Sequence, residues 1–189
     1  MTIVNTDKHT LRLQLLQHRQ ALPLATWQSH SDLICAHLAD CSQFITARTI
    51  LAYQSHRQEP NLADLFTHAP QQWGLPRSVG KDLLWHRWQP SEPLVIGKYD
   101  IREPHPKSPL LAANCVDLIL VPAVAMDARG YRLGYGGGYY DRLRSNPLWR
   151  KIPTIGIVFD FADVEQLPID PWDVPLDAVC TELGVKSAS

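Results

Sequence analysis

The 189-residue chain carries almost no net charge and has no long hydrophobic run, and both absences exclude classes of function. Its 18 basic and 19 acidic residues leave a formal net charge of −1, so nothing in the composition points to nucleic acid or an anionic membrane as a partner. No apolar run approaches the length that spans a bilayer, and the opening MTIVNTDKHTLRLQ lacks the long apolar core of a signal peptide. We therefore expect a cytoplasmic protein that binds neither nucleic acid nor a membrane.

Cysteine and histidine are too scattered to suggest a metal site. The four cysteines (Cys35, Cys41, Cys115 and Cys180) show no paired ligand spacing, and the eight histidines show no HxxxH or HExxH pattern. In a chain of this size, such cysteines are typical of reduced thiols in the cytosol. We expect no zinc site.

Apolar periodicity predicts helices at the start of the chain and strands alternating with helices after it. Asp7 or Thr6 is the expected N-cap of a first helix, which runs to about Leu22. Pro23 ends this helix, and a second one is expected over residues 25–39. Short helices (61–69 and 139–145) and strands (49–54, 72–78, 83–88, 117–123, 154–159 and 177–182) complete the predicted order.

Three features of this pattern bear on the fold. Residues 117–123, DLILVPA, form a continuous apolar run, as expected for a strand with both faces covered. Pro76 should place its strand at a sheet edge or at a strand end, and residues 90–109, with five prolines, should form an ordered loop. The alternation predicts a single α/β domain over residues 1–189, with three layers and a mostly parallel, Rossmann-like sheet flanked by helices. We expect it to act as a monomer.

Glycine is concentrated in one stretch of the chain. Five of the ten glycines fall in the nine residues from Gly130 to Gly138, around the run RLGYGGGYYD (132–141). Such a cluster indicates unusual backbone dihedrals or the close approach of a ligand. The run begins about ten residues after the 117–123 strand and leads into a helix, so we place it at the carboxyl edge of the sheet, where backbone N–H groups can receive an anion such as phosphate.

The glycine run fits neither of two common phosphate motifs. No Lys-Ser or Lys-Thr follows a glycine, as the P-loop requires, and Tyr139 stands where the fingerprint GxGxxG needs its third glycine. A flexible turn with structural glycines is the alternative. Four glycines between an arginine, two tyrosines and an aspartate favour a ligand-binding loop.

RLGYGGGYYDRL strongly resembles the signature of the 5-formyltetrahydrofolate cyclo-ligase family, whose members are also called methenyltetrahydrofolate synthetases. KHTLR (8–12) resembles the nucleotide-contacting segment of that family, and YQSHRQEPNL (53–62) resembles its folate segment, with Gln58 where a small residue or glycine is usual. LPRS, IREP, DLILVPAVAMDARG and PLDAVCTE also stand in the expected order, so the resemblance covers nearly the whole chain. Many bacterial relatives have His-Asp where this chain has Trp172-Asp173, and Trp172 is therefore given no role.

The resemblance implies that 5-formyltetrahydrofolate and ATP give 5,10-methenyltetrahydrofolate, ADP and phosphate. The γ-phosphoryl group of ATP goes to the formyl oxygen, which gives an iminophosphate; N10 then attacks the activated carbon, and phosphate departs. No protein nucleophile is required. Such chemistry calls for backbone N–H groups, cations and Mg²⁺.

The resemblance also assigns nucleotide contacts. ATP-binding residues are implied at Lys8, His9, Thr10, Leu11 and Arg12, and at Arg132, Leu133, Gly134, Tyr135, Gly136, Gly137, Gly138, Tyr139 and Tyr140. Lys8, Arg12 and Arg19 lie on one helix face, which without the resemblance would be interpreted as a solvated basic edge. Arg132 and Asp141 are the implied catalytic residues, and the fork of Arg132 suits phosphate oxygens or braces the loop.

Asp141 and Asp177 are the implied Mg²⁺ ligands, since a hard cation bound with ATP takes one or two protein carboxylates plus phosphates and waters. The alternatives are a first-turn helix residue for Asp141 and a turn residue for Asp177.

Folate contacts are implied at Gln54, Glu59, Tyr135, Gly136, Gly137, Gly138 and Tyr139. Glu59 can accept hydrogen bonds from the donor-rich pterin ring, or be a simple loop carboxylate. Tyr139 and Tyr140 can stack on the pterin or pack beneath the loop, and we expect Tyr139 to be the outward one.

Two other functions fit parts of the pattern. A sugar-phosphate isomerase or CoA-transferase on a related α/β scaffold would share the fold, but an isomerase would not depend on ATP. A folate- or nucleotide-binding regulator without turnover would need Asp141 or Lys8 to be lost, and both are present.

Overall fold

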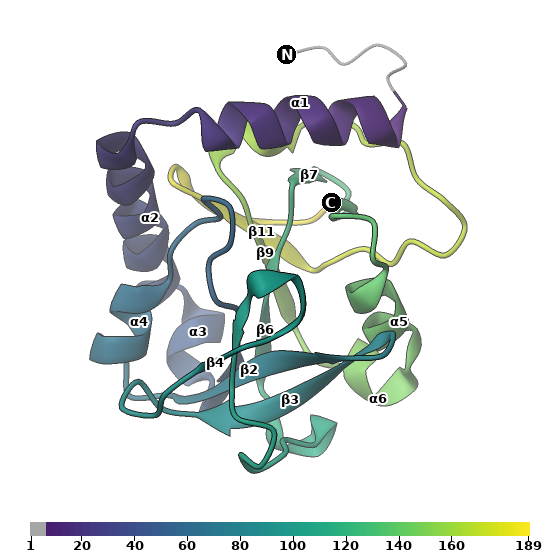
Figure 1. Ribbon diagram of the computed structural model, residues 1–189. Coiled ribbons are helices and arrows are strands. Elements are labelled where there is room, and N and C mark those ends of the chain that lie inside the picture. Colours follow the sequence, from purple (N-terminus) through teal and green to yellow (C-terminus); the bar gives the residue numbers. More distant parts are fainter. Residues whose placement is uncertain (1–6) are drawn as a thin grey trace.

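Residues 7–189, which the computed structural model describes, fold around a seven-stranded sheet (Figure 1). The strands lie in the order β12-β11-β9-β6-β1-β2-β3. They are β1 (Thr49–Leu51), β2 (Gln72–Val79), β3 (Asp82–Trp88), β6 (Leu118–Pro122), β9 (Thr154–Ile157), β11 (Ala178–Thr181) and β12 (Gly184–Ser187). The inner pairs are parallel, whereas the edge strands β12 and β3 are antiparallel to their neighbours. The prediction of a mostly parallel sheet is confirmed.

Helices cover both faces of the sheet. On one face lie α2 (Leu24–Ala39), α3 (Ser42–Thr46) and α4 (Ala63–His68); on the other lie α1 (Lys8–Gln20), α5 (Tyr139–Ser145) and α6 (Pro147–Arg150). Along β6, Leu118 and Leu120 join the first core, whereas Ile119 and Val121 join the second. Since successive side chains of a strand point to opposite faces, burial on both sides explains the continuous apolar run.

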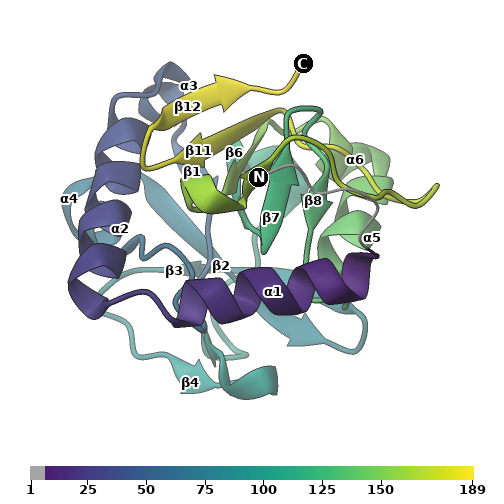
Figure 2. The same cartoon turned by 90° about the horizontal axis from the view of Figure 1, so that it is seen from above.

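The first helix is fixed at its start by a side-chain cap. Asp7 Oδ1 accepts hydrogen bonds from the backbone nitrogens of His9 (2.8 Å) and Thr10 (3.1 Å). Thr6, the other predicted cap, lies outside the described residues. Viewed from above, α1 extends from the α5 side of the molecule to the α2 side, with its N-terminal end near α5 (Figure 2).

Pro76 lies inside the sheet, so the prediction that it marks an edge or a strand end does not hold. β2 pairs with β1 as far as Gly74 and with β3 along its whole length, with Pro76 opposite Trp85. The backbone carbonyl of Trp85 accepts a hydrogen bond from Leu111, on the side away from β2. Pro76 and Trp85 therefore form a residue pair that exchanges no hydrogen bonds, and on the other side of Pro76 strand β1 has already ended. Its missing N–H is tolerated for this reason.

The structure also has short elements that the sequence pattern does not predict. The proline-rich loop contains the ribbon β4 (Val95–Ile96) and β5 (Arg102–Glu103), joined by η1 (Lys98–Asp100), and a small second sheet has the order β10 (Asp163–Val164), β7 (Ala125–Asp127), β8 (Arg132–Leu133). The remaining 3-10 turns are η2 (Ala113–Cys115) and η3 (Asp160–Ala162). Across residues 7–189, no helix has both the length and the apolar character needed to cross a membrane.

Candidate functional site

A cavity of about 600 Å³ opens where the carboxyl ends of β1 and β6 meet the glycine run. Its wall includes Gln54 beyond β1, Pro122 at the end of β6, and residues 132–141. Lys8 and Arg12 contribute from α1. The volume is that of a small-molecule site, and the position is the one where open α/β sheets bind their ligands.

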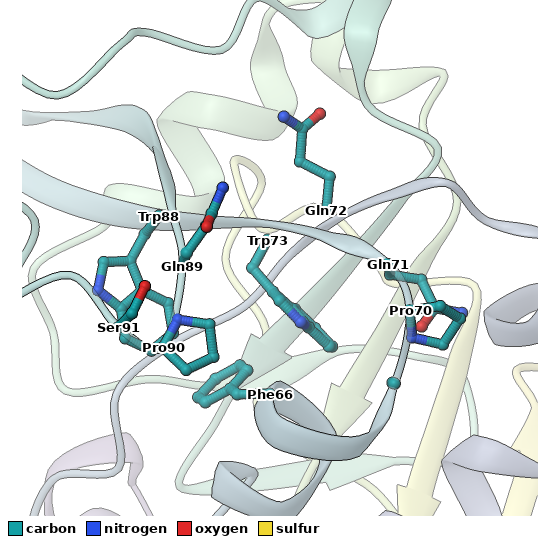
Figure 3. Close-up of a pocket in the computed structure, with 10 residues that line it drawn as sticks. Phe66, Pro70, Gln71, Gln72, Trp73, Trp88, Gln89, Pro90 and Ser91 are labelled. Atoms are coloured by element: carbon teal, nitrogen blue, oxygen red, sulfur yellow. The ribbon is translucent and has the colours of Figure 1, made fainter.

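A second hollow, of about 510 Å³, has a different character (Figure 3). It lies between α4 and the end of the β2–β3 pair where β2 begins and β3 ends. Half of its lining residues are aromatic or proline, such as Phe66, Trp73 and Pro90. It contains no charged residue and none of the residues that the sequence singles out. We therefore place the site in the first cavity.

The glycine run forms an open loop that leads into α5. Gly136 (φ +96°) and Gly138 (φ +63°) have left-handed backbones, which side chains adopt only with strain. A Cβ on Gly134 would meet no atom within 4 Å, and one on Gly136 would first meet the guanidinium carbon of Arg12, at 4.0 Å. The loop is thus open at Gly134 and Gly136, and a cation lies beside it.

Two arginines hold the loop. Arg12 Nε donates to the backbone oxygen of Gly134 at 2.6 Å. Arg132 is almost fully buried; its Nη2 lies 2.5 Å from Asp141 Oδ1, and its Nη1 donates to the backbone oxygen of Val174 at 2.8 Å. Arg132 therefore braces Asp141 and the loop, and its fork is already partly engaged.

Lys8 is held by two carboxylates that the sequence analysis did not assign to the site. Its Nζ lies 2.6 Å from Asp170 Oδ2 and 2.5 Å from Asp173 Oδ2, and all three residues line the cavity. Partial burial opposes the charged form, but the two hydrogen bonds outweigh it and raise the pKa of Lys8. The sequence signal that was available is the turn pattern Asp-Pro-Trp-Asp, in which both aspartates lie on one side of a tight bend.

The opposite end of the cavity contains Glu59, which is 4% exposed. Its Oε2 accepts a hydrogen bond from the backbone nitrogen of His56 at 3.0 Å, and its backbone oxygen accepts one from Trp27 Nε1 at 3.0 Å. Arg57 (φ 49°) and Gln58 (φ 55°) have left-handed backbones in this tight turn. The left-handed backbone at position 58 explains physically why a glycine suits it.

Burial shifts the ionisation of Glu59. Loss of hydration raises its pKa to about 7, although the nearby Arg19 guanidinium and the hydrogen bond from His56 oppose the shift. Arg19 is itself buried, donating to the backbone oxygens of Arg57 (3.1 Å) and Ala123 (3.3 Å) and to the Tyr135 hydroxyl. Arg19 is therefore not part of a solvated edge; it is a buried cation between the glycine loop and the Glu59 turn.

The two adjacent tyrosines have different surroundings. Tyr140 packs edge-on against Trp85, with ring centroids 6.4 Å apart. The Tyr139 hydroxyl accepts a hydrogen bond from Lys98 Nζ at 3.1 Å and lies 3.4 Å from the Tyr99 hydroxyl, both from the short turn between β4 and β5. This turn, within the proline-rich loop, therefore reaches the glycine run and contributes to the cavity wall.

Four of the implied site residues are not among those that line the cavity. The His9 and Thr10 backbones are occupied by the Asp7 cap, and Leu11 is buried in the core. Asp177 Oδ2 accepts hydrogen bonds from the backbone nitrogen and Oγ1 of Thr154, at 2.9 and 2.6 Å, and lies 3.7 Å from Arg144 Nη2. Asp177 thus fastens β9 to the segment before β11, and its role as a metal ligand stays a prediction.

Among residues 7–189, no group of three or more His, Cys, Asp or Glu side chains could hold a metal ion by itself. Of the two predicted Mg²⁺ ligands, Asp141 and Asp177, only Asp141 lines the cavity. The Asp141 side chain is 26% exposed. A single carboxylate suits Mg²⁺ that arrives with a nucleotide, because phosphates and waters then supply most of its ligands.

Comparison with known proteins gives one consistent result. The sequence profile of the 5-formyltetrahydrofolate cyclo-ligase family matches residues 4–182. The 5-formyltetrahydrofolate cyclo-ligase of Mycolicibacterium smegmatis is 32% identical over 187 residues, which is 93% of each chain. That of Escherichia coli K12 is 39% identical over 107 residues; this alignment spans 56% of the present chain and 58% of the E. coli protein.

A solved structure agrees over nearly the full length. The Aquifex aeolicus 5,10-methenyltetrahydrofolate synthetase superposes with a TM-score of 0.84 at 31% identity, covering 96% of this chain and 92% of the other. With the fold, the glycine loop and the profile match in agreement, the chain belongs to the 5-formyltetrahydrofolate cyclo-ligase family.

Proposed function

We propose that the protein converts 5-formyltetrahydrofolate to 5,10-methenyltetrahydrofolate with ATP and Mg²⁺, releasing ADP and phosphate. The observation that carries this proposal is a single cavity with two unlike ends. One end has Lys8, Arg12 and the backbone N–H groups of the glycine loop, and the other has the buried carboxylate of Glu59. The first suits a polyphosphate and the second suits a ring with several N–H donors.

The proposed reaction has two steps in this cavity. The formyl oxygen attacks the γ-phosphorus of ATP, so an O–P bond forms and ADP leaves. N10 then attacks the activated formyl carbon, N10 loses its proton, and the C–O bond breaks to release phosphate. Neither step needs a protein nucleophile, so the contribution of the protein is to position the two substrates and to stabilise charge.

The cationic end supplies this charge stabilisation. The guanidinium of Arg12 lies beside the open loop at Gly136, where a phosphate can meet both the cation and the backbone N–H groups. Arg132 acts by holding Asp141 in place. Asp141 would hold Mg²⁺, which would supply positive charge to offset that of the phosphates.

The carboxylate end selects the folate. The pterin ring presents adjacent N–H donors, and an ionised Glu59 can accept from two of them at once. Gln54, which lies on the same wall, adds an amide that can donate and accept. Since the pKa of Glu59 is about 7, its ionised form becomes dominant only above neutral pH unless a ligand favours it.

The test is formation of the methenyl product, followed by its near-ultraviolet absorbance, with and without ATP and Mg²⁺. We expect product only when both are present. A sugar-phosphate isomerase or CoA-transferase would leave 5-formyltetrahydrofolate untouched, and a regulator would bind it without turnover. Unchanged substrate with folded protein, ATP and Mg²⁺ would refute the proposal.

A further inference from the structure

Trp172 is the most exposed large aromatic side chain of the described residues, at 68%, and it lines the cavity. The other tryptophans contribute to the packed core or its margins. Exposed apolar side chains are common on protein surfaces and by themselves signify little. Trp172 differs because the segment that presents it is tightly fixed.

The turn Asp170–Asp173 presents this side chain. The backbone nitrogen of Asp173 donates to the backbone oxygen of Asp170 at 3.0 Å, and the backbone nitrogen of Asp170 donates to Asp173 Oδ2 at 2.8 Å. Pro171 occupies the second position of this β-turn, where its fixed φ is favourable. Trp172 therefore projects from a four-residue bend that is closed by two hydrogen bonds.

Two cations fasten this bend to the nucleotide end of the cavity. Lys8 Nζ contacts both aspartates, and Arg132 Nη1 donates to the backbone oxygen of Val174, the next residue along the chain. Trp172 is thus tied to Lys8 and Arg132, rather than to the turn that carries Glu59. The indole therefore lies at the Lys8 end of the cavity and not at the Glu59 turn.

The charges of the Asp170–Asp173 bend indicate which part of a nucleotide the indole would contact. Asp170 and Asp173 place two carboxylates around the Lys8 ammonium, so its charge is already compensated and this side of the cavity is the weaker site for a triphosphate. Arg12 and the glycine loop form the better phosphate site. The uncharged part of the nucleotide is its base, and aromatic side chains stack on nucleobases regardless of sequence.

We propose that Trp172 is the stacking platform for the nucleobase of ATP. This inference rests on the proposed function, because it takes ATP to be a substrate. It assigns the phosphates to Arg12 and the glycine loop, and the purine to the indole at the tip of the Asp170–Asp173 bend.

The experiment compares ATP with a ligand that has phosphates but no base. Calorimetric titrations would use Mg²⁺–ATP and Mg²⁺–tripolyphosphate with the wild-type protein and with Trp172→Ala, Trp172→Leu and Trp172→Phe. Loss of base stacking should weaken ATP binding by about 5- to 150-fold in the alanine variant. The leucine variant should lose nearly as much, and the phenylalanine variant should retain most of the affinity. Tripolyphosphate should bind all four proteins equally.

Each other outcome has a definite meaning. Equal weakening of ATP and tripolyphosphate in the alanine variant would show that Trp172 shapes the bend and does not contact the base, which overturns the inference. Unchanged ATP affinity in the alanine variant, or full affinity in the leucine variant, would overturn it as well. If the wild-type protein failed to bind ATP, the proposed function itself would fall, so the two failures are distinguishable.

Discussion

Replacement of Glu59 by glutamine is expected to stabilise the protein above neutral pH and to weaken folate binding. Burial raises the pKa of this carboxyl from 4.5 to about 7. Since each pKa unit corresponds to about 1.4 kcal/mol, an ionised Glu59 costs the free folded protein about 3 kcal/mol. Glutamine keeps the shape without the charge and removes that cost.

The sign of the pH dependence follows from the same numbers. The folded protein binds the Glu59 proton more tightly than the unfolded chain does, so the associated stability is fully present below about pH 4.5 and is lost as pH rises through about 7. Glu59→Gln has no ionisable group at this position, so its stability does not fall in this way as pH rises. Between pH 5 and pH 8, the free energy of unfolding of the variant should therefore gain about 2–3 kcal/mol on that of the wild type.

Urea unfolding of both proteins at pH 5 and pH 8 measures this difference. Effects of the amide that do not depend on pH cancel in the comparison, and Glu165→Gln, at an exposed position, is the matched control. Calorimetric titration at pH 8 should show folate binding about 10- to 100-fold weaker in Glu59→Gln, with ATP binding unchanged. Parallel pH profiles of the two proteins, or unaltered folate affinity, would refute the reasoning.

Three further variants test the nucleotide end. Arg12→Ala should raise the ATP KM about 10- to 100-fold with little effect on the folate KM, in steady-state titrations of each substrate; equal effects on both would contradict its assignment to ATP. Gly136→Val should abolish turnover, because φ is +96° there, with only a modest fall in Tm; Gly134→Ala, which meets no atom within 4 Å, is the control for folding. Asp141→Asn should lower kcat and raise the Mg²⁺ requirement, with partial recovery at high Mg²⁺, whereas matching Mg²⁺ titrations would leave Asp141 only a structural partner of Arg132.

The layered fold was predictable because its signals are local and strong. The run DLILVPA predicts a strand covered on both faces, and β6 divides its side chains between the two cores accordingly. The helix over residues 139–145 is confirmed at the predicted bounds. β7, β8 and β10 were not predictable, because strands of two or three residues carry too little periodicity to distinguish them from loops.

The contacts within the site were harder to predict, since they join residues that are far apart in sequence. Lys8 meets Asp170 and Asp173 across more than 160 positions. Arg19 shares a helix face with Lys8 and Arg12, yet it is buried, because the Glu59 turn and the glycine loop close over its end of the helix.

Asp177 shows why a role implied by resemblance needs a test of its own. Its position in the sequence matches a proposed metal ligand, but it does not line the cavity, and its Oδ2 accepts two hydrogen bonds from Thr154. No periodicity or spacing in the sequence distinguishes a carboxylate that binds a backbone nitrogen from one that binds a cation.

The central claim is that ATP and 5-formyltetrahydrofolate react directly with each other in one cavity. Its most direct test is the fate of the formyl oxygen, followed with substrate that carries ¹⁸O at that atom. If the formyl oxygen attacks the γ-phosphorus, mass spectrometry should find one ¹⁸O in each phosphate released and none in the methenyl product. Phosphate without the label would show that ATP is hydrolysed by water, and would contradict the account.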